Sequence, residues 1–234
     1  MNDPVQIRAE NVFSNLRVMS EEEEEKFFFK NVVCAHLNGG GLPKRFWYEI
    51  IDWTNKAQHR VFQRVKSTLQ GEGSIVALVG KRGTGKTTII AQIMIDRILT
   101  WHHWHSLHVK ERTGRAPQGL GKYFKCIEVS AKMKANYSDS GTINGEEIEM
   151  YRDRLTSCSL LILDEKHDAD ELRVTDRILT DVLDRRYSAR KDSIIISNQS
   201  EQEFRDTTND SILSRISEHG LIIPCEWESF RTQK

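Results

Sequence analysis

The stretch GKRGTGKTT, residues 80–88, decides the fold that this sequence predicts. It fits the phosphate-binding pattern G-x-x-x-x-G-K-[ST] at each fixed position. Backbone N–H groups of such a loop, together with the N-terminus of the following helix, point at bound phosphates. We therefore expect the whole loop to bind a nucleotide through Gly80, Lys81, Arg82, Gly83, Thr84, Gly85, Lys86, Thr87 and Thr88.

The residues on either side supply the context that this loop requires. An apolar run, SIVALVG at 74–80, predicts a buried strand before the loop, and TTIIAQIMIDRIL at 87–99 predicts a helix after it. Lys86 is expected to contact the β and γ phosphates of the nucleotide, and Thr87 to ligate Mg²⁺. The alternative is a glycine-rich turn without a ligand, which the complete pattern in this context disfavours. The loop alone does not distinguish a kinase, a GTPase switch and an ATP-driven machine.

A second group of residues lies in LLILDE at 160–165. The apolar strand delivers Asp164 to its carboxyl end, where a carboxylate can hold the water shell of Mg²⁺. Glu165 follows directly and can orient and deprotonate an attacking water, which is hydrolysis chemistry that a small-molecule kinase must exclude. The alternative is a strand-end carboxylate that caps the next turn. The phosphate-binding loop upstream favours the catalytic interpretation.

A third buried strand ends in SIIISNQS at 193–200. Asn198 at its tip can hydrogen-bond the γ phosphate or the lytic water. Taken alone this is a weak signal, because Asn is common in turns. After the two motifs above, it fits a residue that senses the nucleotide.

The rest of the chain from residue 43 alternates strand-like and helix-like patterns. Two further apolar runs predict strands, YFKCIEV at 123–129 and GLIIP at 220–224. Helical spacing is present at Ala57, Val61, Val65 and Leu69, and again at Leu172, Leu179, Val182 and Leu183. Strands that alternate with helices predict an α/β fold with a mainly parallel, five-stranded sheet covered by helices on both sides.

The N-terminal part differs in composition. Residues 1–41 are polar, carry the run EEEEE at 21–25 and end in NGGG. We expect an extension or small helical piece there, a possible partner-binding element, followed by one domain over 42–234. The alternative without a specific function is that the acidic run is a solvated face or tail. The segment EKFFFKNVVCAHL at 25–37 is apolar enough to pack on something.

Bulk properties limit the partners. The 234 residues include 34 Lys or Arg and 34 Asp or Glu, so the formal net charge is zero and a polyanion must meet a local basic patch. No apolar run predicts a membrane span, and the first residues, MNDPVQIRAE, do not read as a signal peptide. The four cysteines are scattered without a C-x-x-C pair, which fits a reducing cytosol.

Several segments together resemble a known family. LILDE, DRRYSARKDSIIISNQS, ILSRI and WESFR follow one another as they do in the DnaC/IstB group of AAA+ ATPases, and GLPKRF at 41–46 resembles the segment before the ATPase core of helicase loaders. The resemblance covers roughly residues 41–231. That group contains bacterial and phage replicative-helicase loaders and the ATPase subunits of some transposons. The resemblance implies location in the cytoplasm of a bacterium or of a phage-infected host.

The same resemblance implies roles for two arginines. Arg215, in the segment similar to LSRI, would act on the nucleotide of a neighbouring subunit, so the active form would be an ATP-dependent homo-oligomer. Arg231, in the segment similar to ESFR, would sense the nucleotide from the C-terminal side. The alternative for each is a surface or salt-bridging arginine.

Two departures from the family pattern are visible. Asp164-Glu165 stands where the family often has Asp-Asp, which keeps the metal ligand. The region before GLPKRF is short and has no zinc-binding cysteine cluster, although loaders commonly grip the helicase with that region.

Two segments are candidates for contact with single-stranded DNA. Residues 101–123 interleave aromatic and basic side chains, and Trp101 and Trp104 could stack on bases. The alternative is a helix end that packs its tryptophans on the core. Lys132 and Lys134 follow the second strand, where related ATPases line a central pore. The histidines near Trp101 have no Cys or carboxylate beside them that would favour a metal site.

The motifs predict an ATP-hydrolysing, Mg²⁺-dependent protein, and the resemblance implies an AAA+ protein that loads a replicative helicase onto single-stranded DNA during replication. An ATPase that assists a transposase is the alternative within the family, since the catalytic core does not separate the two. A small-molecule kinase is the alternative from another class. A module that binds nucleic acid and uses its nucleotide only structurally is disfavoured by Lys86, Asp164 and Glu165.

Overall fold

The computed structural model describes residues 20–49, 55–107, 120–134, 145–166 and 172–230. By contacts between residues the chain divides into two compact units, Met1–Ala35 and His36–Lys234. The division expected from composition, after residue 41, stays a prediction. The contact boundary lies earlier in the chain because the Gly40 carbonyl accepts a hydrogen bond of 2.7 Å from the Tyr123 N–H, which ties the glycine run to the larger unit.

In the smaller unit the acidic run is helical. Helix α2 spans Glu21–Phe28 and continues into a π-helical turn, Phe29–Val33. Ser20 and Glu23 form a reciprocal capping box, which satisfies two of the N–H groups that a helix start leaves without partners. Negative charges near a helix N-terminus also complement its dipole. Helix α3, Cys34–Gly39, leads into the larger unit.

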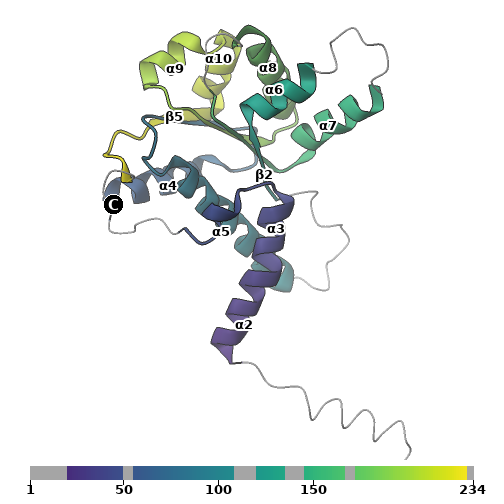
Figure 1. The fold of residues 1–234 in the computed structure, drawn as a ribbon, viewed down its shortest axis with the longest axis vertical. Helices are drawn as coiled ribbons and strands as arrows, with labels where there is room; N and C mark the ends of the chain where they lie inside the picture. Colours follow the sequence, from purple (N-terminus) through teal and green to yellow (C-terminus); the bar gives the residue numbers. More distant parts are fainter. Residues whose placement is uncertain (1–19, 50–54, 108–119, 135–144, 167–171, 231–234) are drawn as a thin grey trace, which may run out of the picture. The chain divides into compact units, whose positions relative to one another are not determined.

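The larger unit is built on a five-stranded sheet in the order β2-β3-β4-β1-β5, and every neighbouring pair is parallel (Figure 1). The strands are β1 Ile75–Val79, β2 Lys122–Lys125, β3 Leu160–Asp164, β4 Asp192–Ile196 and β5 Gly220–Pro224. The predicted α/β class and the parallel five-stranded sheet are confirmed. All residues of β1, β3 and β4 are buried, as strands covered on both faces must be.

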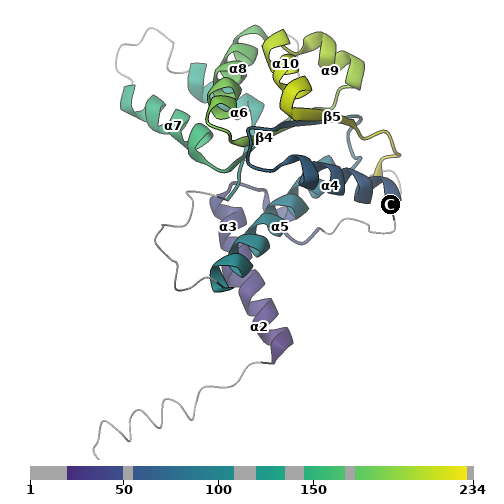
Figure 2. The same ribbon diagram turned by 180° about the vertical axis from the view of Figure 1, so that it is seen from behind.

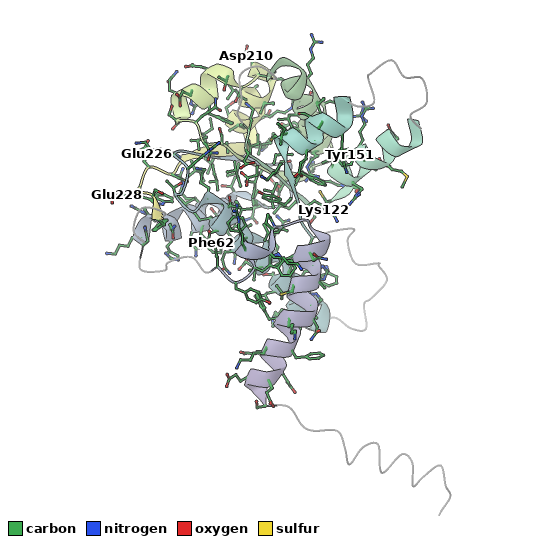
Figure 3. All side chains as sticks on the ribbon, viewed as in Figure 1. Phe62, Lys122, Tyr151, Asp210, Glu226 and Glu228 are labelled. Carbon is green, nitrogen blue, oxygen red and sulfur yellow. The ribbon has the colours of Figure 1, made fainter. Side chains whose placement is uncertain are left out.

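Helices cover both faces of this sheet, as two opposite views show (Figures 1 and 2). On one face lie α4, Lys56–Thr68, and α5, Lys86–Leu107. The other face is covered by α6 Cys126–Lys134, α7 Gly145–Ser157, α8 Leu172–Ser188, α9 Glu201–Thr207 and α10 Asp210–His219. Phe62 of α4 and Tyr151 of α7, labelled in Figure 3, come from these two opposite faces. No helix of the described residues has the length and apolar character that crossing a membrane requires.

The buried faces follow the predicted spacing. Leu179, Val182 and Leu183 of α8 are each at most 1% exposed and belong to one apolar cluster with β1 and β3. On α4, Val61 and Val65 are buried, and Leu69 is buried just beyond the helix end. These residues of the predicted stripes are therefore buried, whereas Ala57 is half-buried and the side chain of Leu172 lies outside the described residues.

One predicted strand is too long. The run 123–129 was expected to be extended throughout, but β2 ends at Lys125 and Cys126 begins α6. Cys126 and Val129 both lie in the apolar cluster, three residues apart, which is a helical spacing. A short apolar run fits a strand and a buried helix end equally well, and this run contains both.

The amino ends of β3 and β4 are joined by buried charged side chains. The Arg186 guanidinium of α8 is 0% exposed and donates to the carbonyls of Leu155 and Cys158 at 2.9 Å, to the Asp192 carbonyl and to the Ser193 hydroxyl. Burial lowers the pKa of this guanidinium. The Asp192 carboxylate, also 0% exposed, accepts from the N–H groups of Gly71 and Ser74 and pairs with Arg97 at 3.4 Å.

Candidate nucleotide-binding site

The glycine-rich loop runs from the end of β1 to the start of α5, as predicted. Gly80 has φ +133°, and a Cβ there would lie 2.5 Å from the Cys225 carbonyl oxygen, so only glycine fits. Gly85 has φ +78°, and a Cβ there would lie 2.8 Å from Gln58 Nε2. These glycines let the backbone curve tightly ahead of the N-terminus of α5, and a helix N-terminus favours a bound anion.

Lys86 is held inside the curve of this loop. Its side chain is 4% exposed, and Nζ donates to the carbonyl oxygens of Gly80 at 2.6 Å and Lys81 at 2.8 Å. The loop carbonyls compensate the burial of the ammonium group. A triphosphate would meet a positive charge already fixed at the centre of the loop.

The loop is tied to two distant parts of the chain. Gly80 N–H donates to the Gln199 carbonyl at 2.7 Å, beyond the end of β4. Residues 225–230, called here the C-terminal segment, follow β5. From this segment Trp227 Nε1 donates to the Thr84 carbonyl at 2.8 Å, and Phe230 N–H donates to the Gly83 carbonyl at 3.0 Å. The conformation of the loop thus depends on β4 and on the C-terminal segment.

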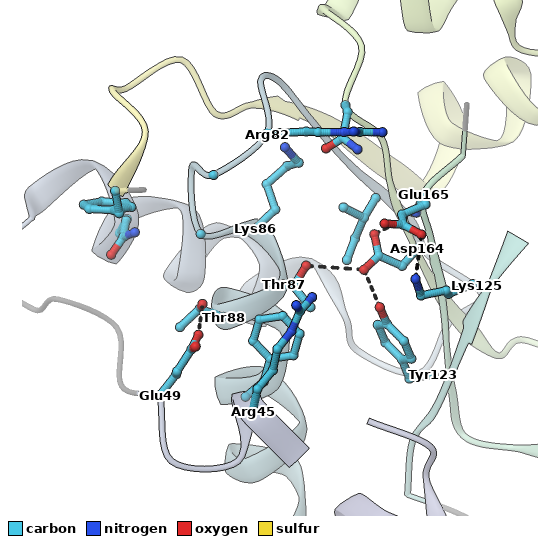
Figure 4. Close-up of a pocket in the computed structure, with 17 residues that line it drawn as sticks. Arg45, Glu49, Arg82, Lys86, Thr87, Thr88, Tyr123, Lys125, Asp164 and Glu165 are labelled. Atoms are coloured by element: carbon cyan, nitrogen blue, oxygen red, sulfur yellow. Dashed lines mark hydrogen bonds and ion pairs between the residues drawn. The ribbon is translucent and has the colours of Figure 1, made fainter. Parts of the chain in front are cut away.

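The two acidic residues lie at the carboxyl end of β3, opposite the loop (Figure 4). Asp164 Oδ2 accepts hydrogen bonds from the Thr87 hydroxyl at 3.3 Å and from the Tyr123 hydroxyl at 2.5 Å. Asp164 Oδ1 accepts from the Glu165 N–H at 2.7 Å. Burial and the neighbouring Asp164 charge raise the pKa of Tyr123, so its hydroxyl remains a donor at neutral pH.

Glu165 has a left-handed backbone, with φ +60°, which is uncommon for a residue other than glycine. Its carboxylate is paired with Lys125 Nζ at 2.9 Å, and both side chains are about two-fifths exposed, at 41% and 39%. The hydrogen bond to Glu165 raises the pKa of Lys125. The turn at Glu165 is anchored to the end of β4, because Lys166 N–H donates to the Ile196 carbonyl and the Ser197 hydroxyl donates to the Lys166 carbonyl.

A cavity of about 770 Å³ joins the loop to the acidic residues. Predicted residues that line it are Arg82, Gly83, Gly85, Lys86, Thr87, Thr88, Asp164, Glu165 and Asn198. Asn198 comes from the segment after β4, beside the acidic turn. The structure therefore brings the three predicted motifs to one edge of the sheet, at the carboxyl ends of β1, β3 and β4, where open α/β sheets bind ligands.

Other residues at this cavity were not predicted. Arg45 points into it beside Thr87 and Tyr123 (Figure 4), and Glu49 accepts a hydrogen bond of 2.9 Å from the Thr88 hydroxyl. Tyr123, Lys125, Gln58 and Phe230 line it as well. Lys125 had a signal in the sequence, because it is a polar residue at the end of β2, the strand next to the one that carries Asp164 and Glu165. Arg45, Gln58 and Phe230 carry no such signal, because their place depends on how distant segments pack.

The donor set fits a metal–polyphosphate. Four cations line the cavity, Arg45, Arg82, Lys86 and Lys125. The Thr87 hydroxyl and the Asp164 carboxylate are hard oxygen ligands of the kind Mg²⁺ takes in combination with substrate phosphates. The described residues contain no group of three or more His, Cys, Asp and Glu side chains that could hold a metal ion by themselves, so the ion would share its ligands with the phosphates.

The two predicted arginines lie differently. Arg215 of α10 does not line the cavity; its guanidinium pairs with Asp184 of α8 at 3.1 Å, donates to the Ser211 carbonyl at 2.8 Å and lies over the Tyr187 ring. A role at a neighbouring subunit stays a prediction. Arg231 lies outside the described residues.

Of the predicted DNA contacts, Trp101 and Lys132 are described by the structure, and neither lines the cavity. Trp101 of α5 is half-buried. The centroid of its ring lies 4.7 Å from that of the His102 ring and 6.3 Å from that of the His36 ring. Lys132 of α6 is exposed and lies over the Tyr151 ring at 4.9 Å. The side chains of Trp104 and Lys134 lie outside the described residues. The role of these four residues in binding DNA stays a prediction.

Comparison with known proteins gives similarity in structure alone. No family model matches the sequence, and no curated protein matches it. Solved structures that are similar include the DnaC helicase loader, at 18% identity and TM-score 0.53 over 78% of this chain and 99% of that one. DnaI is similar at 14% identity and TM-score 0.53, over 82% of this chain and 98% of that one. AMPPCP-bound DnaA from Aquifex aeolicus is similar at 20% identity and TM-score 0.54, over 81% of this chain.

This chain spans about half the length of that DnaA structure, 53%. At these identities the likeness shows the fold. The larger unit has the AAA+ P-loop fold, with the phosphate-binding loop, the DE strand and the Asn198 strand in adjoining places on its sheet.

Proposed function

We propose that this chain is an ATP-hydrolysing AAA+ protein that acts on DNA and loads a replicative helicase onto single-stranded DNA. One observation carries the hydrolytic part: Lys86, Thr87, Asp164 and Glu165, from two distant motifs, face one cavity. Structural similarity supports helicase loading, because this chain covers nearly all of the DnaC helicase loader and DnaI chains that it matches, 99% and 98%.

The proposed chemistry follows from the side chains. Lys86 and the loop N–H groups would bind the β and γ phosphates. Thr87 and Asp164 would hold Mg²⁺, which would neutralise charge that develops on the phosphates. Glu165 orients a water for in-line attack and accepts its proton. Arg45 and Arg82 add positive charge at the cavity wall. Asn198, which lines the cavity, would hydrogen-bond the terminal phosphate or the attacking water.

The neighbouring subunit supplies a further cation in this proposal. Arg215 leaves its contact with Asp184 and reaches the nucleotide of the adjacent copy, so that hydrolysis requires an ATP-dependent homo-oligomer, and Arg231 senses the same nucleotide from the C-terminal side. Single-stranded DNA binds to local basic and aromatic groups, with Trp101, Trp104, Lys132 and Lys134 as the candidates. A transposase in place of the helicase is the alternative partner, with the same hydrolytic site.

The test is ATP hydrolysis by defined mixtures of subunits, with and without single-stranded DNA. Lys86→Ala and Arg215→Ala should each be inactive alone, whereas a mixture should recover part of the activity at junctions where two intact halves meet. Lys66→Ala is the matched control: Lys66 is an exposed residue of α4 that pairs with Asp96 and does not line the cavity, so this variant should hydrolyse ATP normally. A wild-type chain that neither binds nor hydrolyses ATP would contradict the proposal, and an inert mixture would contradict the shared site. Capture of a helicase or a transposase from host lysate by the wild type identifies the partner.

A further inference from the structure

The edge strand β2 supplies a partner to each acidic residue at the end of β3. The two strands pair with Tyr123 opposite Ile162 and Lys125 opposite Asp164. Tyr123 and Lys125 are two residues apart, so their side chains lie on the same face of the strand. Lys125 reaches Glu165 and Tyr123 reaches Asp164 (Figure 4).

The Asp164 carboxylate has donors on both oxygens. The backbone N–H of Glu165 fixes Oδ1, at 2.7 Å. At Oδ2 the Tyr123 hydroxyl donates at 2.5 Å and the Thr87 hydroxyl at 3.3 Å. If Thr87 turns its oxygen to a metal ion, the Tyr123 hydroxyl remains, among the described side chains, as the donor to Oδ2. The orientation of the carboxylate then depends on the Glu165 N–H at Oδ1 and on the Tyr123 hydroxyl at Oδ2.

The position of Tyr123 favours a specific role for its hydroxyl. The side chain is 6% exposed, and its ring belongs to the wall of the cavity. The ring alone could be supplied by phenylalanine, whereas a buried hydroxyl needs a partner to offset its lost hydration. Its partner here is the carboxylate that the proposed function assigns to the metal.

We infer that Tyr123 is a positioning residue for the metal-binding carboxylate: it holds Asp164 Oδ2 so that the carboxylate faces Mg²⁺ and the nucleotide phosphates. This inference rests on the proposed function, because it names the residue that makes the same site selective for metal-bound nucleotide. Tyr123 touches neither phosphate nor metal in this role. It acts through Asp164, in the way that partners outside the ligand shell orient metal ligands in other proteins.

The experiment measures metal dependence separately from nucleotide affinity. The full chain, as wild type and as Tyr123→Phe, is titrated with a fluorescent ATP analogue in EDTA and then with Mg²⁺ at fixed analogue. We expect equal affinity for the analogue in EDTA, and a Mg²⁺ concentration for half-maximal response that is about 10- to 100-fold higher in Tyr123→Phe. Tyr151→Phe is the matched control, because that ring packs at 6.0 Å against Phe124 and does not line the cavity. Its Mg²⁺ titration should equal the wild type.

A double-mutant cycle separates positioning from a general structural effect. In an Asp164→Asn background, Tyr123→Phe should leave the remaining Mg²⁺ dependence unchanged, since the carboxylate it positions is gone. Tyr123→Phe with a Mg²⁺ titration identical to wild type, or with an equal effect in both backgrounds, overturns the inference and leaves the proposed function standing. A wild type that binds no analogue with or without Mg²⁺ overturns the proposed function and this inference with it.

Discussion

The two ends of the parallel sheet both hold buried charges, and they hold them in different ways. At the amino ends of the strands, Arg186 and Asp192 are fully buried and their hydrogen-bonding atoms meet backbone groups and side chains of the same chain. At the carboxyl ends, Lys86 and Asp164 are also buried, at 4% and 6% exposure, but they line a cavity of about 770 Å³.

The difference separates a structural charge from a functional one. Burial and a shifted pKa are present at both ends, since burial lowers the pKa of Arg186 and raises that of Tyr123. Neither property therefore identifies a site by itself. What distinguishes the carboxyl end is space for a ligand, with cations and metal-binding oxygens facing that space. Substitutions at the amino end should change stability, and substitutions at the carboxyl end should change chemistry.

The largest expected effect is on catalysis at the carboxyl end. Glu165→Gln should hydrolyse ATP about 10²- to 10⁴-fold more slowly, because the amide cannot accept the proton of the attacking water. Nucleotide binding and the midpoint of urea unfolding should remain close to wild type. Glu72→Gln, in the exposed turn before β1 at the opposite end of the sheet, is the control and should hydrolyse normally. Near-normal turnover in Glu165→Gln would remove this residue from the role of base.

The next largest effect is on stability at the amino end. Arg186→Met should lower the free energy of unfolding by about 3–5 kcal/mol, because several buried carbonyls lose a charged donor and each unsatisfied group costs about 1–3 kcal/mol. Urea denaturation measures the change. Its neighbour Arg185 is exposed and pairs with Asp181 on the same helix, so Arg185→Met should unfold like wild type. If Arg186→Met keeps its stability but loses nucleotide affinity, the assignment of a purely structural role to the amino-end charges is wrong.

The smallest effect concerns the cavity wall. Arg45→Ala should weaken ATP binding about tenfold, the effect of removing one charge-assisted hydrogen bond to a phosphate. Lys44, the preceding residue, lies over the Trp47 ring and is not part of the cavity lining, so Lys44→Ala is a matched loss of charge. Binding of a fluorescent ATP analogue compares the two. Equal affinities in both variants would show that Arg45 faces solvent and not the nucleotide.

Sequence predicted the local part of this site. The loop, its flanking strand and helix, and the DE strand are each contiguous in the chain, so their geometry follows from pattern and from steric limits on glycine. Tyr123, Arg45 and Gln58 reach the same cavity from segments that are distant in sequence, and their place depends on strand order and helix packing. The error at Cys126–Val129 has the same origin, because periodicity within a short apolar run does not choose between strand and helix.

The strand order has a consequence for how the chain is made. Strand β1, which carries the glycine-rich loop, lies between β4 and β5, and Ile75 pairs with Ser193 on one side and Gly220 on the other. Residues 80–191 must leave the ribosome before either neighbour exists. During that time the apolar stretch IVALV has no strand to pair with, a condition under which nascent chains aggregate or are bound by chaperones. Pairing between such distant segments also slows refolding. The glycine-rich loop is therefore synthesised well before the strands β4 and β5 that hold β1 in the sheet.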